Sequence, residues 1–294
     1  MSRTWNSLRW IERAETGGAR PNTNADMSLP DESRESPVWL QPAGKPTGGS
    51  AESPGSNFCL ERVPSVDAGD VSRIVGFSGP TTPAADRFRL LRMRLRSLRS
   101  IAPLKTILVT SPLPQDGKST VSMNLAMALT EKGSKKVLLI DFDLHRGSAS
   151  EQLHLDDTSG ISECLQSNAD PLTLIRRVDP FGFYALSRGN CSSEIPSELL
   201  LPSAVMPLFS AIAPEFDLVV VDSPPVLPLT DALSLAQCTD GTLLVARAGK
   251  TPTKAVEEAI ELLGRKSLVG VLLNGTEAGH KGYYKYDSYY RNRK

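Results

Sequence analysis

Continuous apolar runs recur along the C-terminal part of the chain and alternate with segments long enough for helices. Several runs contain hardly any polar position, and they fall at residues 106–110, 136–143, 181–186, 216–222, 242–246 and 268–273. Runs of this kind are typical of parallel strands whose two faces are both buried. The helix-length segments between them include residues 120–132, 197–212, 230–237 and 253–263. This order predicts an α/β fold, a doubly wound and mostly parallel sheet flanked by helices.

An amphipathic segment marks the start of the globular domain. Phe88, Leu91, Leu95 and Leu98 recur at the spacing of one helix face, with arginines between them. We therefore expect the domain to occupy residues 81–275.

The sequences on either side of this domain differ from it in composition. Residues 1–80 are rich in proline, glycine and serine, which predicts a largely disordered region. Within it, residues 3–15 mix tryptophan, leucine and isoleucine with charged side chains, so they predict either a short amphipathic helix or a frayed terminus. Residues 276–294 have little to bury and predict a flexible tail.

Charge and cysteine content narrow the possible functions. The 294 residues carry 33 Lys and Arg against 33 Asp and Glu, so we expect no global attraction to nucleic acid or anionic lipid. No pair among the four cysteines has CxxC spacing, which argues against a metal site and favours a reducing cytoplasm. No apolar run approaches the roughly 18 to 20 residues that span a bilayer. Any membrane contact is therefore expected to be peripheral or through a partner.

A candidate phosphate-binding loop follows the first buried run. The segment SPLPQDGKST, residues 111–120, leads from a predicted strand into a predicted helix. Such a turn directs backbone N–H groups at an anion, while Lys118 can reach the β- and γ-phosphates and the next hydroxyl can bind Mg²⁺. Pro112 stands where the usual GxxxxGK[ST] pattern has its first glycine, yet GKST is complete. This context favours a nucleotide site over an ordinary turn.

Three aspartates end predicted strands. Asp141 and Asp143 lie on the same side of an extended segment, and Asp222 follows the apolar run that begins at residue 216. Each aspartate alone is as typical of a helix N-cap as of a metal site. Three of them at the carboxyl ends of strands in one phosphate-loop domain favour nucleotide hydrolysis or phosphoryl transfer.

The C-terminal tail contains most of the tyrosines. Five of the six occur there, namely Tyr283, Tyr284, Tyr286, Tyr289 and Tyr290. Residues 281–294 carry five basic side chains and one acidic side chain, a local net charge of +4. An aromatic interaction tail and a nucleic-acid stacking platform are alternatives. The clustering favours a substrate for tyrosine phosphorylation.

Over residues 84–294 the sequence resembles the bacterial tyrosine kinases (BY-kinases), P-loop autokinases of exopolysaccharide and capsule biosynthesis. The family's loop reads approximately SPxPGEGKST, so Gln115 and Asp116 replace glycine and glutamate. Its DxDxR motif appears with His145 in place of arginine, and its ExxRxxR motif matches Asp86, Arg89 and Arg92. The DTPP, PxELL and closing-strand motifs match residues 222–225, 196–200 and 270–274.

The resemblance implies a P-loop NTPase fold of the deviant Walker type and a role for each matched residue. ATP would be held by the loop residues Gln115, Asp116, Gly117, Lys118, Ser119 and Thr120. Mg²⁺ would be organised by Ser119, Asp143 and Asp222, with Lys118, Asp141 and Asp143 as catalytic residues. Asp141 would accept the proton of the tyrosine hydroxyl, because an ordinary tyrosine pKa of about 10 requires a base.

The resemblance also implies partners. Subunits would form a ring-like homo-oligomer through Asp86, Arg89 and Arg92, with the tail of one subunit in the site of its neighbour. Activation would come from the cytoplasmic part of a membrane-spanning polysaccharide chain-length regulator, which places the protein at the inner face of the membrane. A phosphotyrosine phosphatase is the expected antagonist, and no nucleic-acid partner is expected.

Other classes of protein share parts of this pattern. A partitioning or septum-site P-loop ATPase has the same fold without protein kinase activity, but its loop begins KGGxGK[ST], and Leu113 stands at the position of that lysine. A nucleotide-binding scaffold with little turnover is a third interpretation. A dinucleotide fold is disfavoured, because no GxGxxG follows the first predicted strand.

Overall fold

The computed structural model describes residues 9–11, 58–69, 71, 73–75, 82–155, 158–190 and 197–276. Those from residue 60 onward, together with 9–11, belong to one compact unit. Apart from residue 276, the expected tail with its five tyrosines lies outside the described residues, as does most of the expected disordered region.

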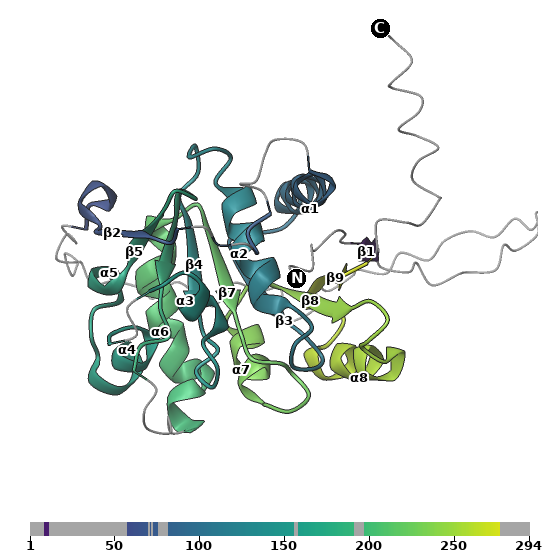
Figure 1. Ribbon diagram of the computed structural model, residues 1–294. Helices are drawn as coiled ribbons and strands as arrows, with labels where there is room; N and C mark the ends of the chain where they lie inside the picture. The colour runs from purple at the N-terminus through teal and green to yellow at the C-terminus, as the bar shows by residue number, and fades with distance from the viewer. Residues whose placement is uncertain are drawn as a thin grey trace, which may run out of the picture. The chain divides into compact units, whose positions relative to one another are not determined.

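The described strands form one sheet at the centre of this unit (Figure 1). Its order is β1 (Arg9–Ile11), β9 (Leu268–Asn274), β8 (Gly241–Arg247), β3 (Thr106–Thr110), β7 (Leu218–Asp222), β4 (Val137–Asp141), β6 (Phe183–Leu186), β5 (Arg176–Asp179) and β2 (Ser65–Asp67). The strands from β9 to β6 run parallel, so their carboxyl ends share one edge. The predicted doubly wound, mostly parallel sheet is thereby confirmed.

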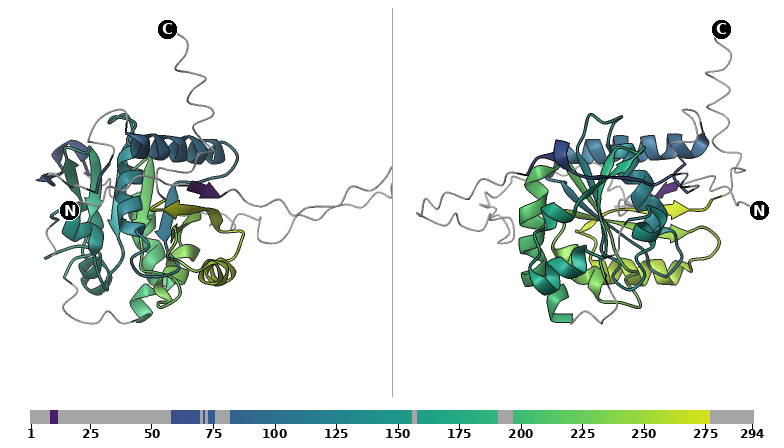
Figure 2. Two further views of the ribbon diagram at one scale, coloured as in Figure 1. Left: turned by 45° about the vertical axis from the view of Figure 1, so that its right-hand side comes forward. Right: turned by 60° about the vertical axis from the view of Figure 1, so that its left-hand side comes forward.

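Helices cover both faces of the sheet (Figure 2). The helices of the described residues are α1 (Pro83–Arg99), α2 (Lys118–Leu129), α3 (Ser148–Gln152), α4 (Ile161–Ser167), α5 (Pro171–Leu174), α6 (Pro202–Ile212), α7 (Asp231–Gln237) and α8 (Thr253–Leu263). Short 3-10 turns occupy Leu60–Arg62, Ser197–Leu200 and Ala213–Glu215. Helix α2 packs on strands β3, β4 and β7, and α1 packs on α2.

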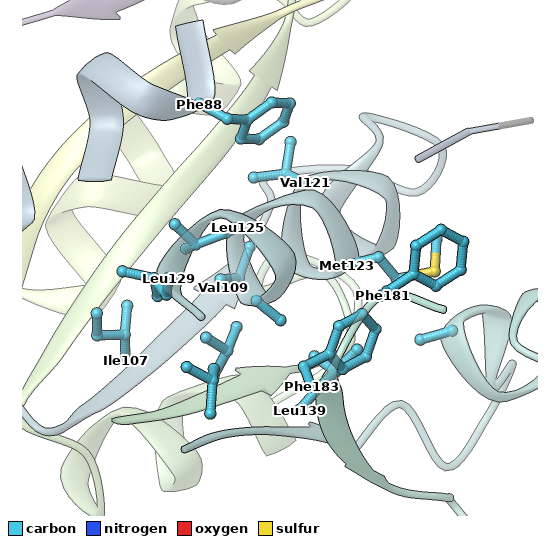
Figure 3. Close-up of a cluster of buried hydrophobic side chains, with 14 of the residues drawn as sticks. Phe88, Ile107, Val109, Val121, Met123, Leu125, Leu129, Leu139, Phe181 and Phe183 are labelled. Atoms are coloured by element: carbon cyan, nitrogen blue, oxygen red, sulfur yellow. The ribbon is translucent and has the colours of Figure 1, made fainter. Parts of the chain in front are cut away.

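Successive side chains of the buried strands point to opposite faces of the sheet and pack against the helices on each face. Ile107, Val109 and Leu139 belong to the cluster that also contains Val121 and Leu125 of α2 (Figure 3). A separate cluster joins strands β8 and β9 to α7 and α8. Because both faces are covered, the strands are apolar at nearly every position, as their sequence predicts.

Helix α1 begins at a well-defined cap. Thr82 accepts a hydrogen bond from the Ala85 N–H through its side chain at 3.2 Å, and proline occupies the first turn. The predicted apolar face is confirmed, since Phe88, Leu91 and Leu95 are buried. Through this face, α1 packs on α2, the helix that follows the predicted phosphate loop.

Two expectations for the N-terminal region are wrong where the structure describes it. The sequence offers a short helix over residues 3–15 as one possibility. Residues 9–11 instead form strand β1, which pairs antiparallel with β9. The sheet edge at β9 offers unpaired N–H and C=O groups, and strand pairing satisfies them.

The domain also begins earlier than residue 81. Ala68, Val71 and Ile74 are buried in the main core. Asn124 of α2 holds this segment, because its side chain accepts from the Val75 N–H at 2.8 Å and donates to the Arg73 carbonyl at 2.8 Å. A few apolar residues in a polar sequence give too weak a periodicity to predict such packing.

Candidate active site

The predicted phosphate loop connects β3 to α2 at the carboxyl edge of the sheet. Gly117 caps α2 with a φ of 95°, a left-handed conformation that favours glycine, and Lys118, Ser119 and Thr120 form the buried first turn. The first N–H groups of a helix have no intrahelical acceptors, so this turn presents donors to an anion.

Lys118 lies among carboxylates. Its Nζ is 2.6 Å from Oδ2 of Asp143, and both side chains are less than a tenth exposed. Burial alone would lower the pKa of Lys118, but the neighbouring Asp222 and Asp143 carboxylates outweigh it and hold that pKa above its ordinary value. The lysine therefore stays charged and available to an anionic ligand.

Asp141 is buried beside Asp222, its register partner on strand β7. Burial and, after it, the like charge of Asp222 together raise the pKa of Asp141 to about 7, although two hydrogen bonds oppose the shift. Those bonds come from the N–H and hydroxyl of Ser150, which donate to Oδ2 at 2.7 and 2.8 Å. A carboxyl group with a pKa near neutrality is suited to proton transfer.

Asp222 has one oxygen without a protein partner. Oδ1 accepts a hydrogen bond from the Ser122 hydroxyl at 3.1 Å, whereas Oδ2 is buried and accepts none in the described structure. Burial raises the pKa of Asp222, while Lys118 and the Ser119 hydroxyl act in the opposite direction. An unsatisfied carboxylate oxygen beside a hydroxyl fits a hard cation such as Mg²⁺.

A complete protein cage for a metal is absent from the part of the chain that the structure describes, where no three Asp, Glu, His or Cys side chains form one. Mg²⁺ in nucleotide sites typically uses one or two protein oxygens and takes the rest from phosphates and water. The donors present therefore fit a Mg²⁺–nucleotide complex.

The raised carboxyl pKa values predict how stability depends on pH without metal and nucleotide. Between pH 4 and pH 7 the folded protein keeps a proton at Asp141 that the unfolded chain releases. Stability should therefore fall as pH rises through this window. We expect the melting temperature to drop by about 5 °C between pH 5 and pH 7.5. Scanning calorimetry of the wild type and Asp141→Asn checks this, since the variant should show a smaller drop.

The expected interface residues lie on α1. Arg89 pairs with Asp86 at 2.5 Å on the surface. Arg92 instead donates to the Ala128 carbonyl at 3.1 Å and so contacts α2 of its own subunit. His145, at the family's arginine position, lies 2.9 Å from the Asp231 carboxylate.

Sequence reasoning missed the serines that support the aspartates. Ser150 belongs to the short helix α3 and is part of none of the motifs found in the sequence. Ser122 lies in α2, one helical turn after the phosphate loop. Spacing gives a signal for Ser122, because it lies three residues after Ser119 and thus on the same side of the helix. Ser150 has no such signal.

Comparisons with known proteins identify the family of the chain. A family model described as the NUBPL iron-transfer P-loop NTPase (ParA) matches residues 104–277. The chain is 35% identical over 192 residues to the tyrosine-protein kinase ptk of Acinetobacter johnsonii, covering 65% of this chain and 26% of ptk. It is 28% identical over 215 residues to YwqD of Bacillus subtilis strain 168, a tyrosine-protein kinase, covering 72% and 90% of the two chains. The solved BceF tyrosine kinase domain is 30% identical with a TM-score of 0.60, over 70% of this chain and 84% of that domain.

The loop, the parallel sheet and the family model define a P-loop NTPase of the ParA type. Within that class, the chain belongs to the bacterial tyrosine kinase family. It spans about a quarter of the length of ptk but nearly all of YwqD. Among the described residues, no helix has the length and apolar character needed to cross a membrane.

Proposed function

We propose that the chain is an ATP-dependent protein-tyrosine autokinase that phosphorylates its own C-terminal tyrosines, between subunits. The observation that carries this proposal is the convergence of buried Lys118 with Asp141, Asp143 and Asp222 at the phosphate loop. A site with one charged lysine and three carboxylates has an excess of negative charge. It therefore suits a polyphosphate only when a divalent cation binds with it and is held by the carboxylates. The family supplies tyrosine as the acceptor, and the acceptor cluster is Tyr283, Tyr284, Tyr286, Tyr289 and Tyr290.

Nucleotide and metal would be held by the loop and the strand ends. Residues 115–120 supply backbone donors and the Lys118 cation for the phosphates. Ser119, Asp143 and Asp222 are the oxygen donors for Mg²⁺, which when bound would neutralise charge on the transferring phosphoryl group.

Asp141 is the proposed base. The tyrosine oxygen forms a bond to the γ-phosphorus, the bond from that phosphorus to the β,γ-bridging oxygen breaks, and the bridging oxygen leaves with its electron pair on ADP. The phenolic proton passes to the Asp141 carboxylate, whose pKa of about 7 lies near neutrality, where a general base is effective. Ser150 orients this carboxylate by its two hydrogen bonds.

Assembly is the proposed level of control. Subunits would meet through α1, with Asp86, Arg89 and Arg92 at or next to the contact. Each phosphate adds about −1.5 to −2 charges, so several would reverse the net charge of +4 on residues 281–294 and disfavour the assembled state. A membrane-spanning chain-length regulator would activate the kinase at the inner face of the membrane, a phosphatase would reset it, and the cycle would regulate exopolysaccharide synthesis and export.

Mass spectrometry of the full chain after incubation with Mg-ATP tests the proposed reaction. We expect phosphate on several of Tyr283–Tyr290, and none on a variant with these five tyrosines changed to phenylalanine. Tyr184, on strand β6, serves as an internal tyrosine that should stay unmodified. An unmodified tail in a protein that hydrolyses ATP, even with a regulator's cytoplasmic domain added, would instead support a partitioning-type ATPase.

A further inference from the structure

Four hydrogen bonds converge on two residues of the phosphate loop, Gln115 and Asp116. The Thr251 hydroxyl donates to Oδ1 of Asp116 at 2.6 Å, and the Leu113 N–H donates to Oδ2 at 3.1 Å. The Asn274 side-chain amide donates to the Asp116 carbonyl at 2.9 Å. The Arg247 guanidinium donates to the Gln115 carbonyl at 3.0 Å. Three of these donors lie more than 130 residues away in sequence.

Sheet topology brings these donors to the loop. Strands β3, β8 and β9 are parallel neighbours, and Arg247 and Asn274 are register partners at the ends of β8 and β9. Thr251 lies in the turn after β8, where its hydroxyl accepts from the Arg247 N–H at 2.7 Å. Because a hydroxyl has a single proton, accepting from Arg247 leaves that proton for Asp116.

The loop needs such support at two points. Gln115 has a φ of 67°, a conformation unfavourable for a residue with a Cβ, and it stands where the resemblance has glycine. Asp116 is a carboxyl group only 4% exposed in a loop that must receive an anion. Burial raises the pKa of Asp116, whereas Thr251, Leu113 and Arg247 stabilise its charged form. Unsupported, this side chain would be unsatisfied or would turn toward the phosphates.

We propose that Thr251 is a positioning residue for nucleotide binding, acting through Asp116 and assisted by Arg247. The Thr251–Asp116 bond and the Arg247–Gln115 bond hold the loop in the conformation whose N–H groups face the phosphates. Thr251 touches the loop from outside, so its effect is on affinity for nucleotide rather than on phosphoryl transfer. This inference rests on the proposed function for the identity of the nucleotide, and its test uses binding as the first measurement.

The test compares Thr251→Val with Thr251→Ser in the full chain. With a fluorescent ATP analogue and Mg²⁺, we expect Thr251→Val to raise Kd about 10- to 100-fold, as for loss of a hydrogen bond to a charged group. Thr251→Ser keeps the hydroxyl and should bind within about threefold of wild type. In tail phosphorylation, Thr251→Val should raise KM for ATP and change kcat less than about threefold.

Two further variants separate positioning from folding. Thr239→Val removes a hydroxyl that donates to the Leu235 carbonyl at 3.3 Å, at the opposite edge of the sheet, and should leave Kd unchanged. Arg247→Met removes the Gln115 contact at a partly exposed site and should raise Kd about 3- to 10-fold, even if Thr251→Val does not fold. Wild-type affinity in folded Thr251→Val, or in Arg247→Met, would overturn the proposal. A wild-type chain that binds no nucleotide would overturn the proposed function as well.

Discussion

Replacing Lys118 by methionine should lower the rate of tail phosphorylation by at least about 1000-fold. The substitution removes the lysine cation that faces Asp143 and Asp222, so a triphosphate would meet buried carboxylates without that compensation. Lysine and metal cations that stabilise the transferring phosphoryl group are among the largest contributors to such reactions. Quantitative phosphotyrosine mass spectrometry at saturating Mg-ATP measures the loss.

Folding must be checked alongside this result. Removing one partner of a buried ion pair destabilises a protein by about 3–5 kcal/mol, because the other charge remains buried. Denaturant unfolding therefore accompanies the assay, and Lys254→Met, at an exposed position of α8, is the matched control. Phosphorylation that persists in folded Lys118→Met would show that the phosphate loop is not where the chemistry occurs.

Changing Asp141 to asparagine should lower kcat by about 10²- to 10⁴-fold, the usual contribution of a general base. Asparagine is nearly isosteric, and its carbonyl oxygen can still accept both hydrogen bonds from Ser150. The affinity for Mg-ATP should change only a few-fold, since Asp141 is proposed to act on the acceptor. Single-turnover kinetics with a separate binding titration distinguish the two quantities.

The control for this substitution is Asp217→Asn. Asp217 lies before strand β7, at the opposite edge of the sheet, and its side chain is more than a third exposed. It should have wild-type kcat and affinity. If Asp141→Asn instead loses affinity and keeps kcat, then Asp141 serves the metal or nucleotide and another group is the base.

The fold was largely predictable because buried parallel strands leave a strong signal. Each predicted apolar run overlaps a strand, and run 106–110 coincides with β3. The short strands β2 and β5 escaped prediction, since segments of three or four residues with charged positions have no distinctive periodicity. Their formation depends on pairing with β6 and its neighbours, which is a tertiary effect.

The candidate site was predictable in composition but not in detail. Parallel strands end at one edge, so the sequence could place Asp141 and Asp222 together with the loop. It could not show that Lys118 pairs with Asp143, because that contact depends on the turn after β4. The contact of Thr251 with Asp116 could not be predicted either, because it depends on the pairing of β8 with β3.

Strand β9 ends at Asn274, whose side chain donates to the Asp116 carbonyl of the phosphate loop, so the sequence that follows starts at the rim of the candidate active site. A chain reaches at most about 3.3–3.6 Å per residue, so the sequence between Asn274 and Tyr283 can span at most about 30 Å and that between Asn274 and Tyr290 at most about 55 Å. In the proposed autokinase, this tether would make the effective concentration of each tyrosine at nearby active sites depend on chain length rather than on the cellular concentration of the protein. Under the proposed function, each tyrosine would therefore reach only those active sites that lie within its own chain-length distance of Asn274.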